Sequence, residues 1–124
     1  MKSIVTWFEI PVSNLEASKS FYEHVFQLEM EDMPIGDNKM ASFPATEVSG
    51  ALLEEPGYKA PDRQVILYLN IPDTIEGVLA RAEEKGGKVE VPRSVITEEI
   101  GWFATFSDLD GNAIGLYESA QRSE

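Results

Sequence analysis

The sequence predicts an α+β fold in which two β-α-β-β-β modules follow one another within a single domain, residues 1–124. The predicted elements of residues 1–60 recur in the same order in residues 61–124, and a segment rich in proline and glycine separates them. Residues 7–10 (Trp-Phe-Glu-Ile) also align with residues 66–69 (Ile-Leu-Tyr-Leu). A chain of 124 residues can bury a real core, so we interpret its halves as duplicated modules of one domain.

The first module begins with a strand at residues 4–12, in which alternate side chains would lie on opposite faces of a sheet. Ser13-Asn14-Leu15-Glu16 has the spacing of a capping box and predicts the start of a helix. Two further strands are predicted near Lys39–Ala45 and Ser49–Glu54. The helix carries an apolar stripe that would cover one sheet face, formed by Leu15, Tyr22, Val25 and Phe26.

The second module repeats this order. Its first strand is predicted at Arg63–Ile71, and Asp73-Thr74-Ile75-Glu76 predicts a second helix start. Gly86-Gly87 would end that helix, because glycine readily adopts the left-handed conformation of a C-terminal cap. Asp110-Gly111 is typical of a hairpin turn between the last two strands. The three strands predicted after the helix are Lys88–Val91, Gly101–Ser107 and Ala113–Glu118.

The charge balance restricts the partners of the chain. Ten basic and 22 acidic residues give a formal net charge of −12 and a pI near 4.4. Phosphate binding needs clustered Lys and Arg, so we expect no nucleic-acid partner, and an anionic membrane surface would repel the chain. The sequence shows no apolar run of membrane-spanning length and no signal peptide, so we expect a cytoplasmic protein.

The sequence has no cysteine and a single histidine, His24. These counts exclude disulfides, thiolate metal ligands, a cysteine nucleophile and any metal site with two histidines from one chain. His24 lies on the polar side of the predicted first helix, so we expect it on the surface.

One face of each sheet should remain free of the helices, and strand alternation assigns side chains to it. The residues predicted to line a ligand-binding cleft are Trp7, Glu9, Leu53, Tyr68, Trp102 and Tyr117. Aromatic rings suit a planar organic molecule, and rings with a carboxylate nearby suit a cationic one. The alternative is that Trp7 and Tyr68 fill the interface between the modules and that Trp102 packs in the ordinary way.

Glu9 is the one carboxylate that alternation places on this lining. A carboxylate among apolar neighbours is a candidate general base, which makes Glu9 a weak candidate for a catalytic residue. The alternative is a partly solvated carboxylate paired with Arg63 or a lysine. We expect Arg63 and Arg93, the arginines nearest to the cleft, to be solvated or paired.

Three segments in order carry a resemblance to a known family. They are FEIPVSNLEASKSFYEHVF (Phe8–Phe26), YLNIPDTIEGVLARAEEKGGKV (Tyr68–Val89) and FSDLDGNAIGLYE (Phe106–Glu118). With the repeated β-α-β-β-β order, they resemble the vicinal oxygen chelate superfamily, which includes glyoxalase I, extradiol dioxygenases and bleomycin-resistance proteins. The last segment is similar to the family's D-P-D-G-N turn, with Leu109 in place of the usual proline.

The resemblance implies one divalent metal in the cleft, held by His or Glu from the first and last strands of each module. The matching positions in this chain are Trp7, Ala51, Ile66 and Gly115, and none of these side chains can ligate a metal. We therefore expect no metal and no cofactor. The resemblance also implies a homodimer, which is the commonest soluble oligomer.

These observations favour a metal-free protein that binds a small organic ligand, like the bleomycin-resistance branch. The alternative is a glyoxalase-like lyase or isomerase, or a dioxygenase-related enzyme, that acts without the usual metal cage. A third hypothesis is a regulatory or structural dimer whose cleft holds nothing specific. The sequence does not identify a ligand or substrate.

Overall fold

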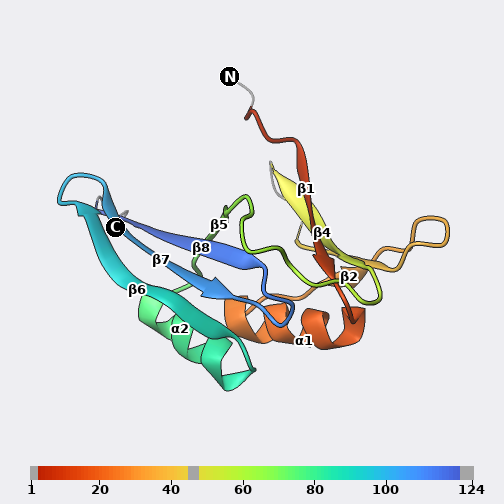
Figure 1. Ribbon diagram of the computed structural model, residues 1–124. Helices are drawn as coiled ribbons and strands as arrows, with labels where there is room; N and C mark the ends of the chain where they lie inside the picture. The colour runs from red at the N-terminus through yellow and green to blue at the C-terminus, as the bar shows by residue number, and fades with distance from the viewer. Residues whose placement is uncertain (1–2, 45–47, 121–124) are drawn as a thin grey trace.

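The computed structural model describes residues 3–44 and 48–120, and it has the duplicated order of elements that the sequence predicts (Figure 1). The strands are β1 (Trp7–Val12), β2 (Glu31–Asp32), β3 (Met40–Ser42), β4 (Ser49–Glu54), β5 (Leu67–Asn70), β6 (Lys88–Thr97), β7 (Gly101–Ser107) and β8 (Ala113–Ser119). The helices are α1 (Leu15–Phe26) and α2 (Ile75–Glu84).

Each module forms its own four-stranded mixed sheet, with strand orders β1-β4-β3-β2 and β5-β8-β7-β6. The first and last strands of each module are parallel neighbours, so that Glu9 lies opposite Ala51 and Tyr68 lies opposite Gly115. The remaining strand pairs are antiparallel. The predicted α+β fold of two tandem modules is therefore confirmed.

Several boundaries differ from the prediction. The sequence does not predict β2, because its two exposed acidic residues carry no strand pattern. The strand expected at Lys39–Ala45 is limited to β3, and Ala45 lies outside the described residues. β5 covers only the second half of the predicted Arg63–Ile71. β6 continues beyond Val91 to Thr97, and its register shifts between Val91 and Ser94. That interval contains Pro92, a residue that cannot donate a ladder hydrogen bond.

Both helices begin one residue later than the capping boxes imply. The side chain of Asn14, and not that of Ser13, caps α1 by accepting a hydrogen bond from the Ala17 N–H at 3.0 Å. Thr74 caps α2 in the same way, with its hydroxyl oxygen 2.9 Å from the Gly77 nitrogen. Ser13 is therefore available for a contact elsewhere in the molecule.

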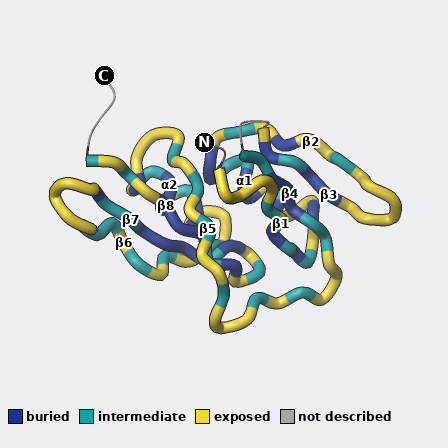
Figure 2. The backbone as a smooth tube through the Cα atoms, turned by 90° about the horizontal axis from the view of Figure 1, so that it is seen from above, coloured by how far each residue is buried: buried dark blue, intermediate teal, exposed yellow. Residues whose placement is uncertain are grey.

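Both helices lie on the same side of the two sheets, and the opposite sheet faces carry no helix (Figure 1). One cluster of buried apolar side chains runs through both modules, with Tyr22, Phe21 and Phe106 among its largest members. Figure 2 shows this burial along the inner strands, whereas the β2–β3 and β6–β7 loops are exposed. Neither helix of the described chain is long and apolar enough to cross a membrane.

Asp108, in the turn between β7 and β8, is a buried carboxylate on which four donors converge. Its Oδ2 accepts hydrogen bonds from the Tyr22 hydroxyl of α1 (2.6 Å) and from the Asn112 side-chain amide (2.9 Å). Its Oδ1 accepts from the backbone N–H groups of Asp110 and Asn112. Burial raises the pKa of Asp108, although the hydrogen bonds from Tyr22 and Asn112 oppose that shift. Burial also raises the pKa of Tyr22 well above its ordinary value, which keeps Tyr22 a donor.

Other residues of the same turn contact the first module and the segment that joins the two modules. The carboxylate of Asp110 accepts hydrogen bonds from both the hydroxyl and the backbone N–H of Ser13. The side chain of Asn112 donates to the Pro11 carbonyl at 2.8 Å and accepts from the Tyr58 hydroxyl at 2.8 Å. The β7–β8 turn therefore ties the start of β8 to the end of β1.

The first prediction concerns this turn. The Asp108→Asn change should lower the free energy of unfolding by about 1–3 kcal/mol, because an amide nitrogen would face donors that need an acceptor. Urea denaturation in mildly alkaline buffer measures the effect. Asp62→Asn is the matched control, since it removes the same charge from an exposed loop position. Equal stability of the two variants would contradict the prediction.

Candidate functional site

The faces that carry no helix hold most of the side chains that alternation assigned to a cleft. In β1, Ile10 and Val12 are buried on the helix side, whereas Trp7 and Glu9 are exposed on the other side. In the second module, Tyr68 is 50% exposed on the same side of its sheet. The helix-free faces of the two modules therefore carry different side chains, although their strands are arranged in the same order.

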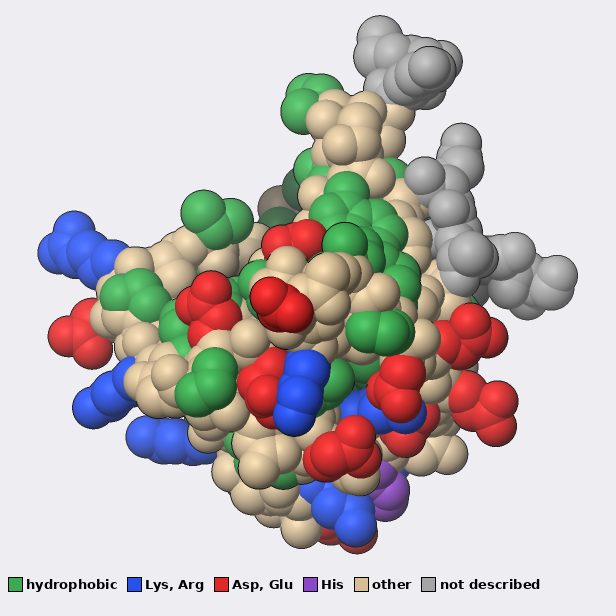
Figure 3. Space-filling model, turned by 90° about the vertical axis from the view of Figure 1, so that its right-hand side faces the viewer, with side chains coloured by type: hydrophobic (Ala, Val, Ile, Leu, Met, Phe, Trp, Pro, Cys, Tyr) green, Lys and Arg blue, Asp and Glu red, His purple; other side chains and the backbone are tan. Residues whose placement is uncertain are grey.

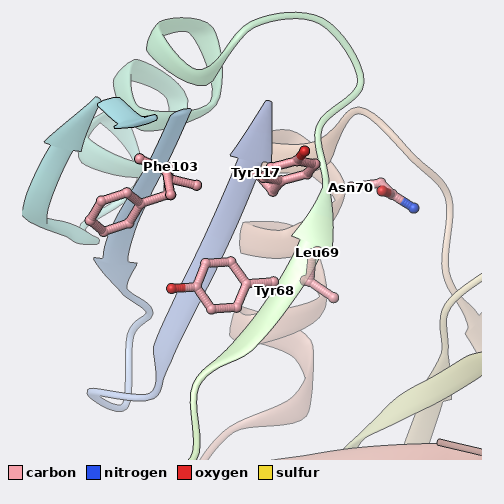
Figure 4. Close-up of a pocket in the computed structure, with 6 residues that line it drawn as sticks. Tyr68, Leu69, Asn70, Phe103 and Tyr117 are labelled. Atoms are coloured by element: carbon pink, nitrogen blue, oxygen red, sulfur yellow. The ribbon is translucent and has the colours of Figure 1, made fainter. Parts of the chain in front are cut away.

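A pocket of about 540 Å³ opens on the helix-free face of the second sheet (Figure 4). This volume suits a small organic molecule. Tyr68 from β5, Tyr117 from β8 and Phe103 from β7 contribute aromatic rings, and Phe103 pairs with Tyr117 across the β7–β8 ladder. The other lining residues are Leu69, Asn70 and Ile96. None of the described residues that line this pocket is charged.

The hydroxyl of Tyr117 is already engaged. It donates a hydrogen bond to the Ile100 carbonyl at 2.8 Å, which ties the β6–β7 hairpin to β8. The Tyr68 hydroxyl and the Asn70 amide, by contrast, make no hydrogen bond within the described residues. Figure 4 shows the Asn70 side chain turned away from the ring of Tyr117. A ligand in this pocket would therefore meet aromatic surface and the free hydroxyl of Tyr68.

The first-module candidates lie outside this pocket. The Trp7 indole N–H donates to the Glu9 carboxylate at 3.1 Å. Trp7 lines a second pocket at the C-terminal end of α1, and Glu9 lines a third one between β1 and the segment before β5. Leu53 lies opposite Pro11 in the β1–β4 ladder and is half-buried. Of the six predicted lining residues, the structure brings together Tyr68 and Tyr117 in one pocket. A ligand-binding role stays a prediction for all six.

Trp102 lies on the helix side of β7, where it packs against the core. The Arg93 guanidinium stands 4.3 Å from the centroid of its ring, and Arg93 also pairs with Glu118 at 2.9 Å. This position fits the packing alternative for Trp102 and the paired alternative for Arg93. Phe103, the next residue, faces the pocket instead. Phe106 is buried on the helix side of β7. Phe103 is three residues away from it, so strand alternation places Phe103 on the opposite, helix-free face.

The residues at the expected metal positions do not fit a metal. Ala51 is fully buried opposite Glu9, and a Cβ atom at Gly115 would lie 2.5 Å from the Tyr68 ring. Among residues 3–44 and 48–120, no cluster of three or more His, Asp or Glu side chains could hold a metal ion. The donor set that a divalent metal requires is therefore missing from this face.

Acidic side chains are prominent on the surface. Figure 3 shows the side of the molecule formed by the first module, with hydrophobic side chains in the upper half and mainly acidic ones below. This distribution agrees with the formal net charge of −12. An anion that approaches the protein meets a repulsive field, which is strongest at low ionic strength.

A family model for the Glyoxalase/Bleomycin resistance protein/Dioxygenase superfamily matches residues 4–116. The chain belongs to this superfamily, as the resemblance of its three segments predicted. No curated protein sequence matches the chain significantly.

Solved structures share the fold over nearly the whole chain. TnmS3, an antibiotic binding protein from Streptomyces sp. CB03234, is 28% identical, with a TM-score of 0.67 over 94% of this chain and 96% of its own. A glyoxylase/bleomycin resistance protein/dioxygenase domain from Frankia sp. EAN1pec is 18% identical, with a TM-score of 0.72 over 96% and 99%. The fosfomycin resistance protein FosX from Listeria monocytogenes is 17% identical, with a TM-score of 0.69 over 94% and 93%. The last two likenesses show the fold alone.

Proposed function

We propose that this chain is a metal-free binding protein for a small, flat organic molecule held on the helix-free face of the second sheet. The observation that carries the proposal is the pocket of about 540 Å³ that Tyr68, Phe103 and Tyr117 line with their rings. Such rings bury large apolar area and favour offset or edge-on contact with another ring. TnmS3, the antibiotic binding protein that is 28% identical to this chain, supports a small organic ligand.

The charge of the protein narrows the ligand class. A net charge of −12 disfavours anions at long range, and the described pocket lining offers no basic side chain to compensate. Exposed aromatic faces attract cations as well as neutral rings. The pocket therefore suits a neutral or cationic planar molecule better than a phosphorylated one.

The second prediction tests this ligand class by calorimetry with proflavine, a planar cation, and 1-naphthyl phosphate. Proflavine should bind more tightly, and Phe103→Ala should weaken its binding about tenfold, because one wall of the pocket is lost. Trp102→Phe is the control, since Trp102 lies on the opposite face of β7. Tighter binding of the phosphate, or unchanged proflavine binding by Phe103→Ala, would contradict the proposal.

The third prediction concerns metal. Protein purified without an affinity tag should contain no stoichiometric Zn, Ni, Mn or Fe, because the four expected ligand positions provide no donor. Elemental analysis measures the content. One equivalent per chain that disappears when a residue of the open faces is changed would overturn this part of the proposal.

The alternative is a glyoxalase-like lyase or isomerase, or a dioxygenase-related enzyme, that works without the metal cage. Its candidate base is Glu9, whose carboxylate accepts the Trp7 N–H and lines a pocket of about 280 Å³ between the modules. This pocket is separate from the aromatic one, so the two functions can be distinguished. Turnover of keto-aldehyde adducts that Glu9→Gln abolishes would favour the enzyme over the binding protein.

The fourth prediction is a homodimer. Outside the aromatic pocket, large apolar side chains remain exposed on or near the helix-free faces, namely Val5, Trp7, Ile66 and Ile100. A second copy of the chain would cover such a surface, and two-fold dimers are the commonest soluble oligomers. Light scattering should give twice the chain mass of 13.8 kDa, whereas a mass near 13.8 kDa at micromolar concentration would reject the dimer.

A further inference from the structure

The ring of Tyr68 lies directly over Gly115 on the open face of the second sheet. The two residues are partners in the parallel β5–β8 ladder. A Cβ atom built on Gly115 would lie 2.5 Å from Cδ2, 2.7 Å from Cε2 and 2.8 Å from Cγ of Tyr68. Figure 4 shows the ring spread across β8, with Tyr117 further along the same strand. The ring therefore covers the backbone of β8 and presents its other side to the pocket.

The backbone conformation does not require glycine at position 115. The described glycines with a positive φ are Gly36, Gly57, Gly86, Gly101 and Gly111. Gly115 is not among them, and it lies inside a regular ladder between the buried side chains of Ile114 and Leu116. Glycine is therefore needed at position 115 because the Tyr68 ring leaves no space for a side chain, and not because of the backbone conformation.

Gly50 in the first module also lies under an aromatic ring, but this contact is on the core side of its sheet. A Cβ atom at Gly50 would lie 2.5 Å from the ring of Phe8, and that pair lies on the helix side of its sheet. Phe8 packs against the core cluster, so the contact there is part of the packing. Tyr68 is instead 50% exposed on the helix-free face. The ring of Tyr68 therefore covers Gly115 on the surface, where its outer side is accessible to a ligand.

We propose that Gly115 is a positioning residue that sets the specificity of the pocket, because it lets Tyr68 lie flat as a platform for an aromatic ring of the ligand. This inference rests on the proposed binding function. With any larger residue at 115, the ring of Tyr68 must swing away from β8 into the space between Phe103 and Tyr117. The pocket would then lose its flat floor, and with it the preference for planar molecules.

A double-mutant cycle without ligand tests the contact itself. Gly115→Ala should lower the melting temperature by about 4 °C in the native background. It should have no such effect in a Tyr68→Ala background, because the ring that collides with the new methyl group is gone. Equal shifts in the two backgrounds would overturn the inference. If Gly115→Ala alone fails to fold, a folded Gly115→Ala/Tyr68→Ala double variant gives the same support.

Proflavine titration tests the platform. Gly115→Ala and Tyr68→Leu should each raise its dissociation constant at least about tenfold, because each removes the flat ring. Ile35→Ala, at an exposed position in the β2–β3 loop outside the pocket, is the control and should bind like the native protein. Unchanged binding by Gly115→Ala, with native binding intact, would overturn the inference and leave the proposed function standing. Absence of saturable binding to the native protein would instead overturn the proposed function.

Discussion

The arrangement of the two modules depends on one buried carboxylate. Asp108 accepts hydrogen bonds from Tyr22 of α1 and from its own turn, and its neighbour Asp110 accepts two more from Ser13. A buried charge without partners would cost several kcal/mol, so these donors have to be in place together. The turn thereby fixes the end of β1 relative to the start of β8. Both helix-free faces, and the pockets on them, take their positions from this constraint.

The two modules have the same strand arrangement, but they differ at matching positions of their helix-free faces. Glu9 opposite Ala51 in the first sheet corresponds to Tyr68 opposite Gly115 in the second. In the first module the carboxylate accepts a hydrogen bond from Trp7 at the sheet surface. In the second module the equivalent position holds a ring that lies against the backbone. The two modules therefore share one strand arrangement, and the side chains at these matching positions make one helix-free face polar and the other aromatic.

Local patterns predicted the fold better than the site. Strand alternation and capping spacing located β1, α1 and α2 because these signals depend on neighbours a few residues apart. Alternation also assigned Tyr68 and Tyr117 to the open face. Trp102 was assigned to the cleft without reference to the buried Phe106 four residues on, and so Phe103 was missed. The adjacent residue Asn14 caps α1 in place of Ser13. Ser13 donates instead to Asp110, which is distant in the sequence, so no local pattern contains this contact.

The contact between Tyr68 and Gly115 also relates the aromatic pocket to the metal sites that the family resemblance implies. A metal-binding carboxylate at position 115 would need the space that the Tyr68 ring now fills, starting from its Cβ atom. A flat ring at position 68 and a ligating side chain at position 115 therefore exclude each other sterically on this sheet. Because Tyr68 and Gly115 are partners in the parallel β5–β8 ladder, side chains at the two positions compete for the same space. In this chain the pair has the aromatic form, so the absence of a ligating side chain at 115 and the flat ring at 68 depend on each other.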